Sequence, residues 1–411
     1  MELLRQAAFR RFWLGQSISL VGDQVSLLAL PLVAVLVLDA GAADMGYLGA
    51  AALAPHLLFS LPAGVWLDRV ARRRRIMIAT DLLRAALLAS VPVAYSLDAL
   101  SLAQLYGVAF LSGSLAVAFD ISYMTIFVSV TSRSHYVQAN ALLNGSRSVS
   151  WLAGPSLAGL LVKLVGAPAT LLADAASYLA SALFLARVRA PEPPLEHNTN
   201  GSWRTQVAEG MRFIAQHPIF RPSLTAVATI NLFNFMFFAL FVLYATRELG
   251  IGPGTLGLVL GAAAVGSILG AVIASRVGVR LGVGGAFALG CVLFPAPLVL
   301  VPLAQGPDWL VLGMLFTAEF VSGLGVMILD INAGAIIVAL TPHRLRSRAT
   351  GAFRFVNYGV RPIGALAGGA LGAAIGLRPA LWIATVGALA GALWLLPSPV
   401  AALRELPEEA A

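Results

Sequence analysis

The chain has 411 residues, of which 59% are hydrophobic and only 11% are charged. A soluble domain carries about a quarter charged residues, so this composition excludes an ordinary soluble protein and predicts a polytopic membrane protein. The formal net charge of +8 would suit a nucleic-acid-binding protein, but the positive charges gather in short loops between apolar runs, which indicates membrane topology instead.

Twelve apolar runs are long enough to cross a bilayer, which takes roughly 20 residues. In chain order we expect spans at 12–38, 45–67, 76–97, 101–128, 138–165, 168–187, 223–246, 254–275, 282–304, 309–338, 350–376 and 379–396. Most of the 27 Lys and Arg residues fall in the loops and tails of one side, and only Lys163, Arg247 and Arg378 fall in loops of the other. Because positive charge marks the cytoplasmic side, both termini are predicted to be cytoplasmic.

The longest polar stretch, about 190–221, separates six spans from six spans. The pattern Ser-Gly-x6-Asp at 112–120 recurs at 322–330, and Arg-x7-Pro at 147–155 recurs at 354–362. These echoes indicate a duplication, and parallel repeats of this kind place a substrate site near the membrane midplane. The predicted domains are an N-terminal six-helix bundle at 1–189, a cytoplasmic linker at 190–221 and a C-terminal six-helix bundle at 222–411.

The loop after the second span, at 64–75, reads Gly-Val-Trp-Leu-Asp-Arg-Val-Ala-Arg-Arg-Arg-Arg. This Gly-x-x-x-Asp-Arg-x-x-Arg-Arg pattern, with twelve spans and a break after the sixth, resembles the major facilitator superfamily. Four further segments resemble the branch of enterobactin exporters and macrolide-efflux proteins. They are Phe-Arg-Arg-Phe-Trp-Leu-Gly-Gln at 9–16, Leu-Pro-Ala-Gly-Val-Trp-Leu-Asp-Arg at 61–69, Gln-Ala-Asn-Ala at 138–141 and Ala-Gly-Pro-Ser-Leu-Ala-Gly at 153–159.

This resemblance implies an all-α membrane protein whose twelve transmembrane helices form two pseudo-symmetric six-helix bundles. It implies a secondary transporter of a bacterial cytoplasmic membrane that exports amphipathic, drug- or siderophore-like small molecules, by alternating access and in exchange for protons. The alternatives are a proton-coupled importer of a small nutrient or peptide and a non-transporting membrane sensor. The expected partners are the substrate, protons and the lipid bilayer, without nucleic acid, for a protein that acts as a monomer.

The sequence contains no nucleotide-binding motif, paired metal ligands or nucleophile elbow, and its single cysteine is Cys291. We therefore expect no catalytic residues, no metal and no cofactor, and the protein is not expected to be an enzyme.

Ionisable residues inside the bilayer are costly, so they are expected to pair, to face water or to have a function. Asp23 lies near the middle of the first span, on the same helix face as Gln16 and Ser19. Glu319 lies near the middle of the tenth span, and His56 lies within the second. These three ionisable residues, Asp23, Glu319 and His56, are our candidates for the coupling proton. The alternative for each is a neutral side chain held in the helix packing.

Two further acids are expected to pair with arginines near the cytoplasmic ends of the spans. Asp120 is predicted to pair with Arg147 and Asp330 with Arg354, one pair in each half. The pairs form either an inner gate that stabilises the outward-open state or a static contact for folding. The resemblance implies that residues of the signature loop join this network, namely Asp68, Arg69 and Arg72.

Two other intramembrane charges complete the expected set. Arg84 is predicted to pair with Asp81, one turn away on the third span, and Asp174 to face Lys163 or water.

One face of the seventh span carries amides and aromatic rings, which suits a large and mostly apolar ligand. Its members are Asn231, Asn234, Phe238 and Phe241. The substrate cavity is expected to include six more residues: Gln16, Ser19, Tyr123, Asn144, Asn357 and Tyr358. Packing or lipid contact is the alternative for an aromatic stripe. Helix bends are expected at Gly154, Pro155 and Pro362.

Overall fold

The structure is a computed structural model that describes the chain in four segments, which are residues 2–67, 72–188, 203–342 and 345–404. Within these segments, some side chains lie outside the description: those of residues 2, 61–67, 203–207, 346–348 and 354. Of the predicted gate residues, Asp68 and Arg69 therefore lie outside the described residues, as does the side chain of Arg354.

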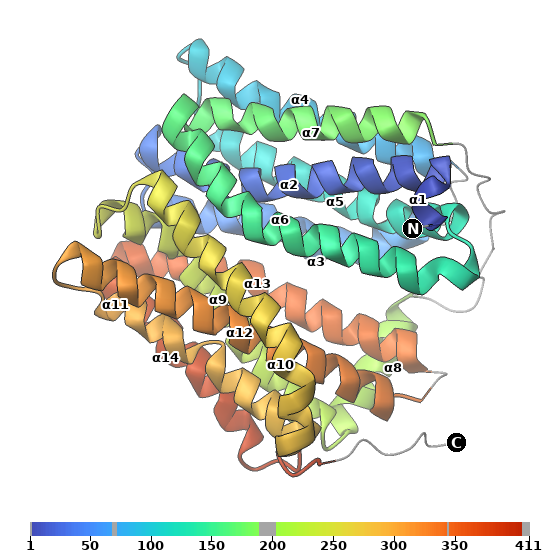
Figure 1. The fold of residues 1–411 in the computed structure, drawn as a ribbon. Helices are drawn as coiled ribbons and strands as arrows, with labels where there is room; N and C mark the ends of the chain where they lie inside the picture. Colours follow the sequence, from blue (N-terminus) through green and yellow to red (C-terminus); the bar gives the residue numbers. More distant parts are fainter. Residues whose placement is uncertain (1, 68–71, 189–202, 343–344, 405–411) are drawn as a thin grey trace. The chain divides into compact units, whose positions relative to one another are not determined.

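The described part of the chain consists of helices, which Figure 1 labels. Up to residue 188 they are α1 (Glu2–Arg5), α2 (Ala7–Leu36), α3 (Ala42–Leu67), α4 (Arg73–Ser96), α5 (Leu102–Val130), the 3-10 turn η1 (Arg133–His135), α6 (Tyr136–Val165) and α7 (Ala167–Ala186). From residue 203 they are α8 (Trp203–Gln216), α9 (Phe220–Arg247), α10 (Pro253–Leu293), η2 (Ala296–Val299), α11 (Leu300–Leu303), α12 (Asp308–Leu340), α13 (Arg346–Ile375), α14 (Leu377–Ala390) and η4 (Gly391–Leu395).

Nine helices of the described part are long and apolar enough to cross a membrane. Large apolar side chains on them stay exposed, such as Leu27 (70% exposed), Leu164 (68%) and Val272 (59%). Such side chains suit lipid contact, because the hydrocarbon core replaces water around a spanning helix. The chain is therefore a multi-pass membrane protein, and the count of twelve spans stays a prediction.

The structure differs from the loop expected at 276–281, between the eighth and ninth spans. Helix α10 continues through residues 276–281 and is interrupted at Gly282, whose φ of 77° and ψ of 161° are not helical. A residue with a side chain rarely adopts this φ, so glycine allows the chain to turn there. The hydropathy pattern located the two apolar runs but did not show that residues 276–281, which contain two arginines, remain helical.

The chain divides into two compact units. The first comprises Met1–Ala40, Ala51–Thr199 and Ile251–Gly261, and the second comprises Gly41–Ala50, Asn200–Gly250 and Ala262–Ala411. The start of α3 thus belongs to the second unit and the start of α10 to the first. The three predicted domains at 1–189, 190–221 and 222–411 remain a proposal.

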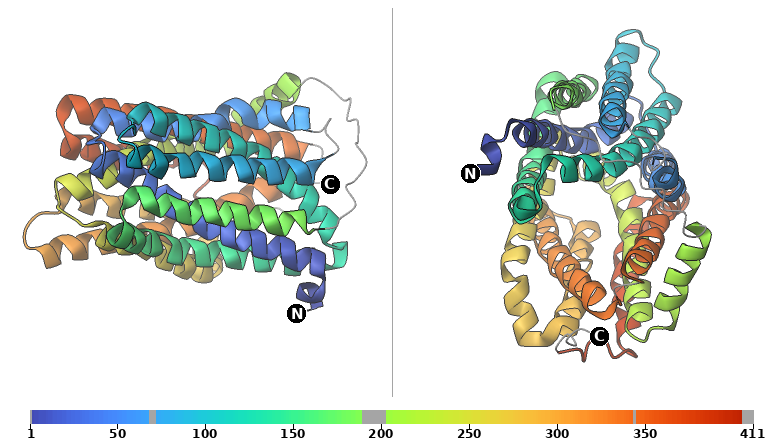
Figure 2. Two further views of the ribbon diagram at one scale, coloured as in Figure 1. Left: turned by 90° about the horizontal axis from the view of Figure 1, so that it is seen from above. Right: turned by 90° about the vertical axis from the view of Figure 1, so that its right-hand side faces the viewer.

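In the first unit, α7 packs against both α2 and α4, and α6 packs against α2 (Figures 1 and 2). A buried apolar cluster fills the space between helices and includes Phe9, Phe12, Met77 and Ile126. The ring of Phe12 stacks on Tyr123 of α5 with centroids 5.3 Å apart. This packing holds the N-terminal parts of α2 and α4 against the C-terminal part of α5.

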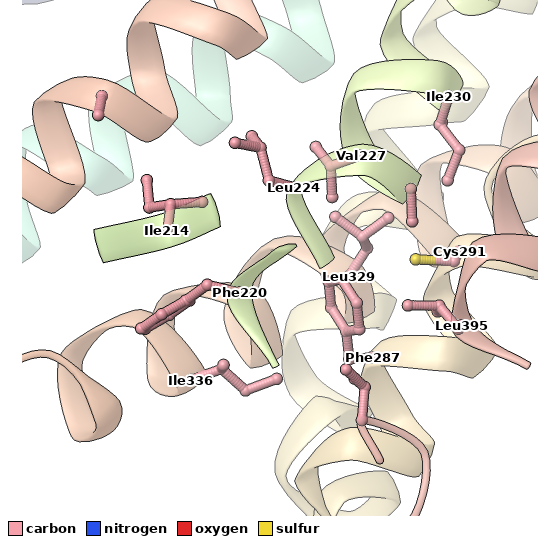
Figure 3. Close-up of a cluster of buried hydrophobic side chains, with 13 residues drawn as sticks. Ile214, Phe220, Leu224, Val227, Ile230, Phe287, Cys291, Leu329, Ile336 and Leu395 are labelled. Carbon is pink, nitrogen blue, oxygen red and sulfur yellow. The ribbon is translucent and has the colours of Figure 1, made fainter. Parts of the chain in front are cut away.

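The second unit has its own core, which Figure 3 shows. Phe220, Leu224 and Val227 of α9 point into it together with Phe287 of α10 and Leu329 of α12. The lone cysteine, Cys291, lies in this core and is fully buried.

Glycine contacts bring two helix pairs to backbone contact. In the second unit, a Cβ on Gly369 of α13 would lie 2.7 Å from the Cα of Gly46 in α3. In the first unit, a Cβ on Gly159 of α6 would lie 3.1 Å from the Cα of Gly257 in α10. Small residues of this kind allow membrane helices to pack closely.

Candidate functional site

An ion pair lies at the centre of the first unit. Asp23, near the middle of α2, accepts a hydrogen bond from Arg84 of α4, with 2.9 Å between Oδ1 and the guanidinium nitrogen. The same carboxylate oxygen accepts a hydrogen bond from the hydroxyl of Tyr178 on α7. The Arg84 guanidinium lies over the Tyr178 ring, 4.1 Å from its centroid, so a cation–π contact adds to the ion pair.

This arrangement corrects the expected pairing of Arg84 with Asp81. Spacing along α4 favoured Asp81, but the helix packing turns the guanidinium toward Asp23, 61 residues away in the sequence. Asp81 is fully buried and lies beside Ser181 of α7, without hydrogen-bond geometry between them. It stays within electrostatic reach of Arg84.

Asp174 also differs from its expected surroundings, because it faces neither Lys163 nor water. It is fully buried on α7, and its Oδ1 accepts a hydrogen bond from Ser177 at 2.9 Å. Both Asp23 and Arg84 lie within electrostatic reach of it. Gly22 of α2 makes room for this contact, since a Cβ there would collide with the Ser177 hydroxyl and with Asp174 Oδ1.

The first unit therefore places several acids around one largely buried guanidinium, that of Arg84, whose side chain is 13% exposed. Arg84 interacts electrostatically with Asp23, Asp174 and Asp81, and also with Asp120 of α5. The side chain of Asp23 is 35% exposed, whereas Asp81 and Asp174 are enclosed. One cation shared by several carboxyl groups of unequal exposure is an arrangement that can bind and release protons, since like charges disfavour simultaneous ionisation.

Asp120 and Arg147, which are predicted to pair, interact electrostatically in the structure. The charge of Arg147 acts on Asp120, although less strongly than those of Arg84 and Asp23. In the described part of the chain the two side chains form no direct ion pair. Both are exposed, at similar positions on α5 and α6. Their role as a gate stays a prediction.

In the second unit a different arginine accompanies Asp330. Arg361 of α13 interacts electrostatically with Asp330 of α12, and its guanidinium lies over the rings of Phe235, at 4.9 Å, and Tyr358, at 4.2 Å. Since the side chain of Arg354 is outside the description, the predicted Asp330–Arg354 pair stays a prediction. Arg361 is the cation that the repeat pattern did not identify.

Glu319 lies on α12 with 3% of its surface exposed, and its Oε1 has no hydrogen-bond partner among the described residues. Burial is the main feature of its environment. His56 lies within α3, where its backbone carbonyl accepts a hydrogen bond from Ser60. Neither residue lies in the Asp23 cluster as far as the described contacts extend.

The predicted cavity residues occupy mixed environments. Asn234 and Phe241 are buried, and Phe241 stacks on Phe237 with centroids 5.3 Å apart. Phe238 is 45% exposed, and Asn231 donates a hydrogen bond to the carbonyl of Val227 at 3.0 Å. The seventh-span face therefore contributes mainly Phe238 to an exposed surface.

The remaining predicted cavity and bend residues are located as follows. Two are buried, Gln16 and Ser19; two are exposed, Asn144 and Tyr358; and two are half-buried, Tyr123 and Asn357. Arg72 precedes α4 and is exposed. Pro155 and Pro362 lie inside α6 and α13. At Gly154, a Cβ would press on the side chain of Gln24 in α2, so this glycine serves close packing.

The sequence pattern did not identify three residues of the cluster, namely Gly22, Ser177 and Tyr178. The available signal was Arg84 itself: a guanidinium in the middle of a spanning helix requires partners on neighbouring helices as well as on its own. Among the described residues, no group of three or more His, Cys, Asp or Glu side chains could hold a metal ion.

The fold and this site can now be compared with known proteins. A family model described as "Transmembrane secretion effector" matches residues 2–410. The multidrug efflux pump Tap of Mycolicibacterium fortuitum is 27% identical over 376 residues, which are 87% of each chain. The pump of that name from Mycobacterium tuberculosis (strain ATCC 25618 / H37Rv) is 27% identical over 379 residues, covering 87% of this chain and 85% of the relative.

Solved structures agree in fold. A bacterial homologue of the iron transporter ferroportin in the inward-facing state gives a TM-score of 0.76 at 16% identity, covering 95% of this chain and 98% of that one. The nucleoside transporter NupG gives 0.72 at 13% identity, covering 97% and 99%. Together with the family match over nearly the whole length, these results show that the chain belongs to the transmembrane secretion effector family of the major facilitator superfamily, whose members are transporters and not enzymes.

Proposed function

We propose that the protein exports amphipathic small molecules across a bacterial cytoplasmic membrane in exchange for protons. The observation that carries this proposal is the Asp23–Arg84–Tyr178 contact, a partly exposed carboxylate held by a largely buried cation at mid-length of α2, α4 and α7. A carboxylate at such a depth is costly to the fold and is retained where it serves transport. The multidrug efflux pumps among the relatives support an export direction.

The proposed cycle uses alternating access. Asp23 takes up a proton from the outside through its exposed part and releases it to the cytoplasm, and the substrate moves in the opposite direction. The aromatic and amide residues of α9 and α13, such as Phe238 and Tyr358, supply apolar contact to the substrate. Both termini are proposed to lie in the cytoplasm, and the protein is proposed to act as a monomer.

A drug-susceptibility panel tests export directly. The protein is expressed in a bacterial host that lacks its own drug pumps, and growth is measured against chemically diverse amphipathic drugs. We expect tolerance to rise for at least one drug with the wild type, and to be lost with Asp23→Asn. The matched control is Asp98→Asn, an exposed carboxyl in the turn after α4. Unchanged tolerance to every drug would refute export of this class.

Inverted membrane vesicles with an acidic lumen then determine coupling. A drug identified by the panel is added outside, and the lumen pH is followed with a trapped dye. Exchange predicts that the drug enters the lumen while the lumen becomes more alkaline. Joint exit of drug and protons from a loaded lumen would indicate an importer, and absence of any flux would indicate a sensor.

A further inference from the structure

The enclosed carboxyl of Asp174 has no role in the function proposed above. It is fully buried, and among the described residues only its Oδ1 has a hydrogen-bond donor, the hydroxyl of Ser177. Its Oδ2 is buried without a hydrogen-bond partner in the part of the chain that the structure describes. A buried carboxylate oxygen without a donor is strongly disfavoured when ionised, because neither water nor protein replaces its hydration. A proton on Oδ2 removes this cost.

The groups facing Asp174 come from three helices. From α2 it meets the charge of Asp23, and Ser26 lies close without hydrogen-bond geometry. From α4 it meets Arg84, which also interacts with Asp81. Its own helix contributes Ser177 and Tyr178. Arg84 is the only cation in this set.

The backbone of α2 closes the site from one side. Gly22 lies so near Ser177 and Asp174 that no side chain fits between them. Asp23, whose charge acts on Asp174, is the more exposed of the two acids: its side chain is 35% exposed, and its Oδ1 accepts hydrogen bonds from both Arg84 and Tyr178.

We propose that Asp174 is a second proton-binding residue of the transport cycle, and that Arg84 links its protonation to that of Asp23. In the conformation described, Asp174 is protonated and Arg84 pairs with ionised Asp23. When Asp23 gains a proton from water on the outside, the guanidinium loses that partner and pairs with Asp174, which releases its own proton to water on the cytoplasmic side in the alternate conformation of the cycle. One O–H bond forms at Asp23 and one breaks at Asp174, so the charge of the cluster is conserved. This cycle rests on the proposed proton exchange, whereas proton binding by Asp174 does not.

Infrared difference spectroscopy tests the proton on Asp174 without any substrate. The purified protein is titrated from neutral to alkaline pH, and the carbonyl-stretch band of protonated carboxylic acids is recorded. We expect the wild type to show such a band, and Asp174→Asn to lose one component of it. The control Asp98→Asn should leave the band unchanged, because Asp98 is exposed and asparagine tolerates its positive φ of 52°. A full band in folded Asp174→Asn would overturn the proposal.

A second variant covers the case in which Asp174→Asn does not fold. Ser177→Ala removes the one hydrogen bond to Asp174 and keeps the carboxyl, so the band component should shift in frequency. A spectrum identical to the wild type would overturn the proposal as well.

Failure of the proposed function gives a different result. If the band component is lost but the wild-type protein moves no protons in vesicles, Asp174 binds a proton and the exchange mechanism is wrong. If exchange occurs and the band is unaffected by both variants, the exchange stands and the role of Asp174 is wrong.

Discussion

Replacement of Gly22 by alanine gives the sharpest test of the packing around Asp174. In the interior of α2, alanine is favoured over glycine by about 1 kcal/mol. Against this gain, the added methyl group would collide with Ser177 and Asp174. Overpacking typically costs about 1–3 kcal/mol, and loss of the Ser177 hydrogen bond to a buried carboxyl costs about 1–3 kcal/mol more. The expected net destabilisation is therefore between about 1 and 5 kcal/mol.

The control for Gly22→Ala is Gly107→Ala. Gly107 lies within α5, and a Cβ there would meet no atom within 4 Å. The control should leave the stability unchanged or raise it through helix propensity alone. The assay heats detergent-purified protein and measures the fraction that remains monodisperse by size-exclusion chromatography. Equal midpoints for the two variants would refute the conclusion that α2 contacts Asp174 and Ser177 this closely.

Three further predictions use the same thermal assay. The half-buried His217 accepts hydrogen bonds at Nδ1 from the backbone amides of Ile219 and Phe220 at the start of α9, and burial lowers its pKa below the usual 6.5. Its stabilising contribution is therefore present above pH 6.5 and is lost as the pH falls through the folded-state pKa. His217→Asn keeps an acceptor and should remove this part of the pH dependence of stability, and an unaltered pH profile would contradict the prediction. Gly369→Val should lower stability by about 1–3 kcal/mol, because the added side chain would meet the backbone of α3. The control Gly351→Val, on the same helix, has open space around its Cβ and should not lower stability in this way. Equal losses of stability in the two variants would argue against the close contact of α13 with α3. Arg361→Lys keeps the charge but loses stacking on two rings, so it should lower the free energy of unfolding by about 0.5–2 kcal/mol more than Arg147→Lys does. A smaller loss of stability at Arg361 than at Arg147 would contradict the stacking.

Much of the helical architecture could be predicted from hydropathy, because a spanning helix needs a long apolar run. The error at 276–281 shows the limit of this approach, since this segment with its two arginines continues the helix to Gly282. Hydropathy detects where a chain can lie in lipid. It does not detect whether a short polar segment between two such runs is coiled or helical.

The candidate site, too, could be predicted only in part from the sequence. Asp23 could be identified because an acid in the middle of a spanning helix is costly wherever it lies. Its partners could not, because Tyr178 is 155 residues away and Arg84 has a nearer acid on its own helix. Which of two acids the guanidinium meets depends on the rotation of α4 against α2 and α7, and a single sequence contains no record of that rotation.

The two units share a repeat pattern but not a distribution of charge, and this difference bears on mechanism. The residue that corresponds to Asp23 in the second unit, at an offset of 211, is Asn234, which is buried and cannot titrate. The second unit's Arg361 lies on two aromatic rings, whereas Arg84 has one ring and a direct carboxylate partner. At the positions that the predicted duplication pairs, the titratable groups therefore differ between the two units. For the proposed exchange, this difference favours Asp23 over its counterpart Asn234 as the proton-binding residue, and the aromatic surroundings of Arg361 suit contact with an apolar substrate.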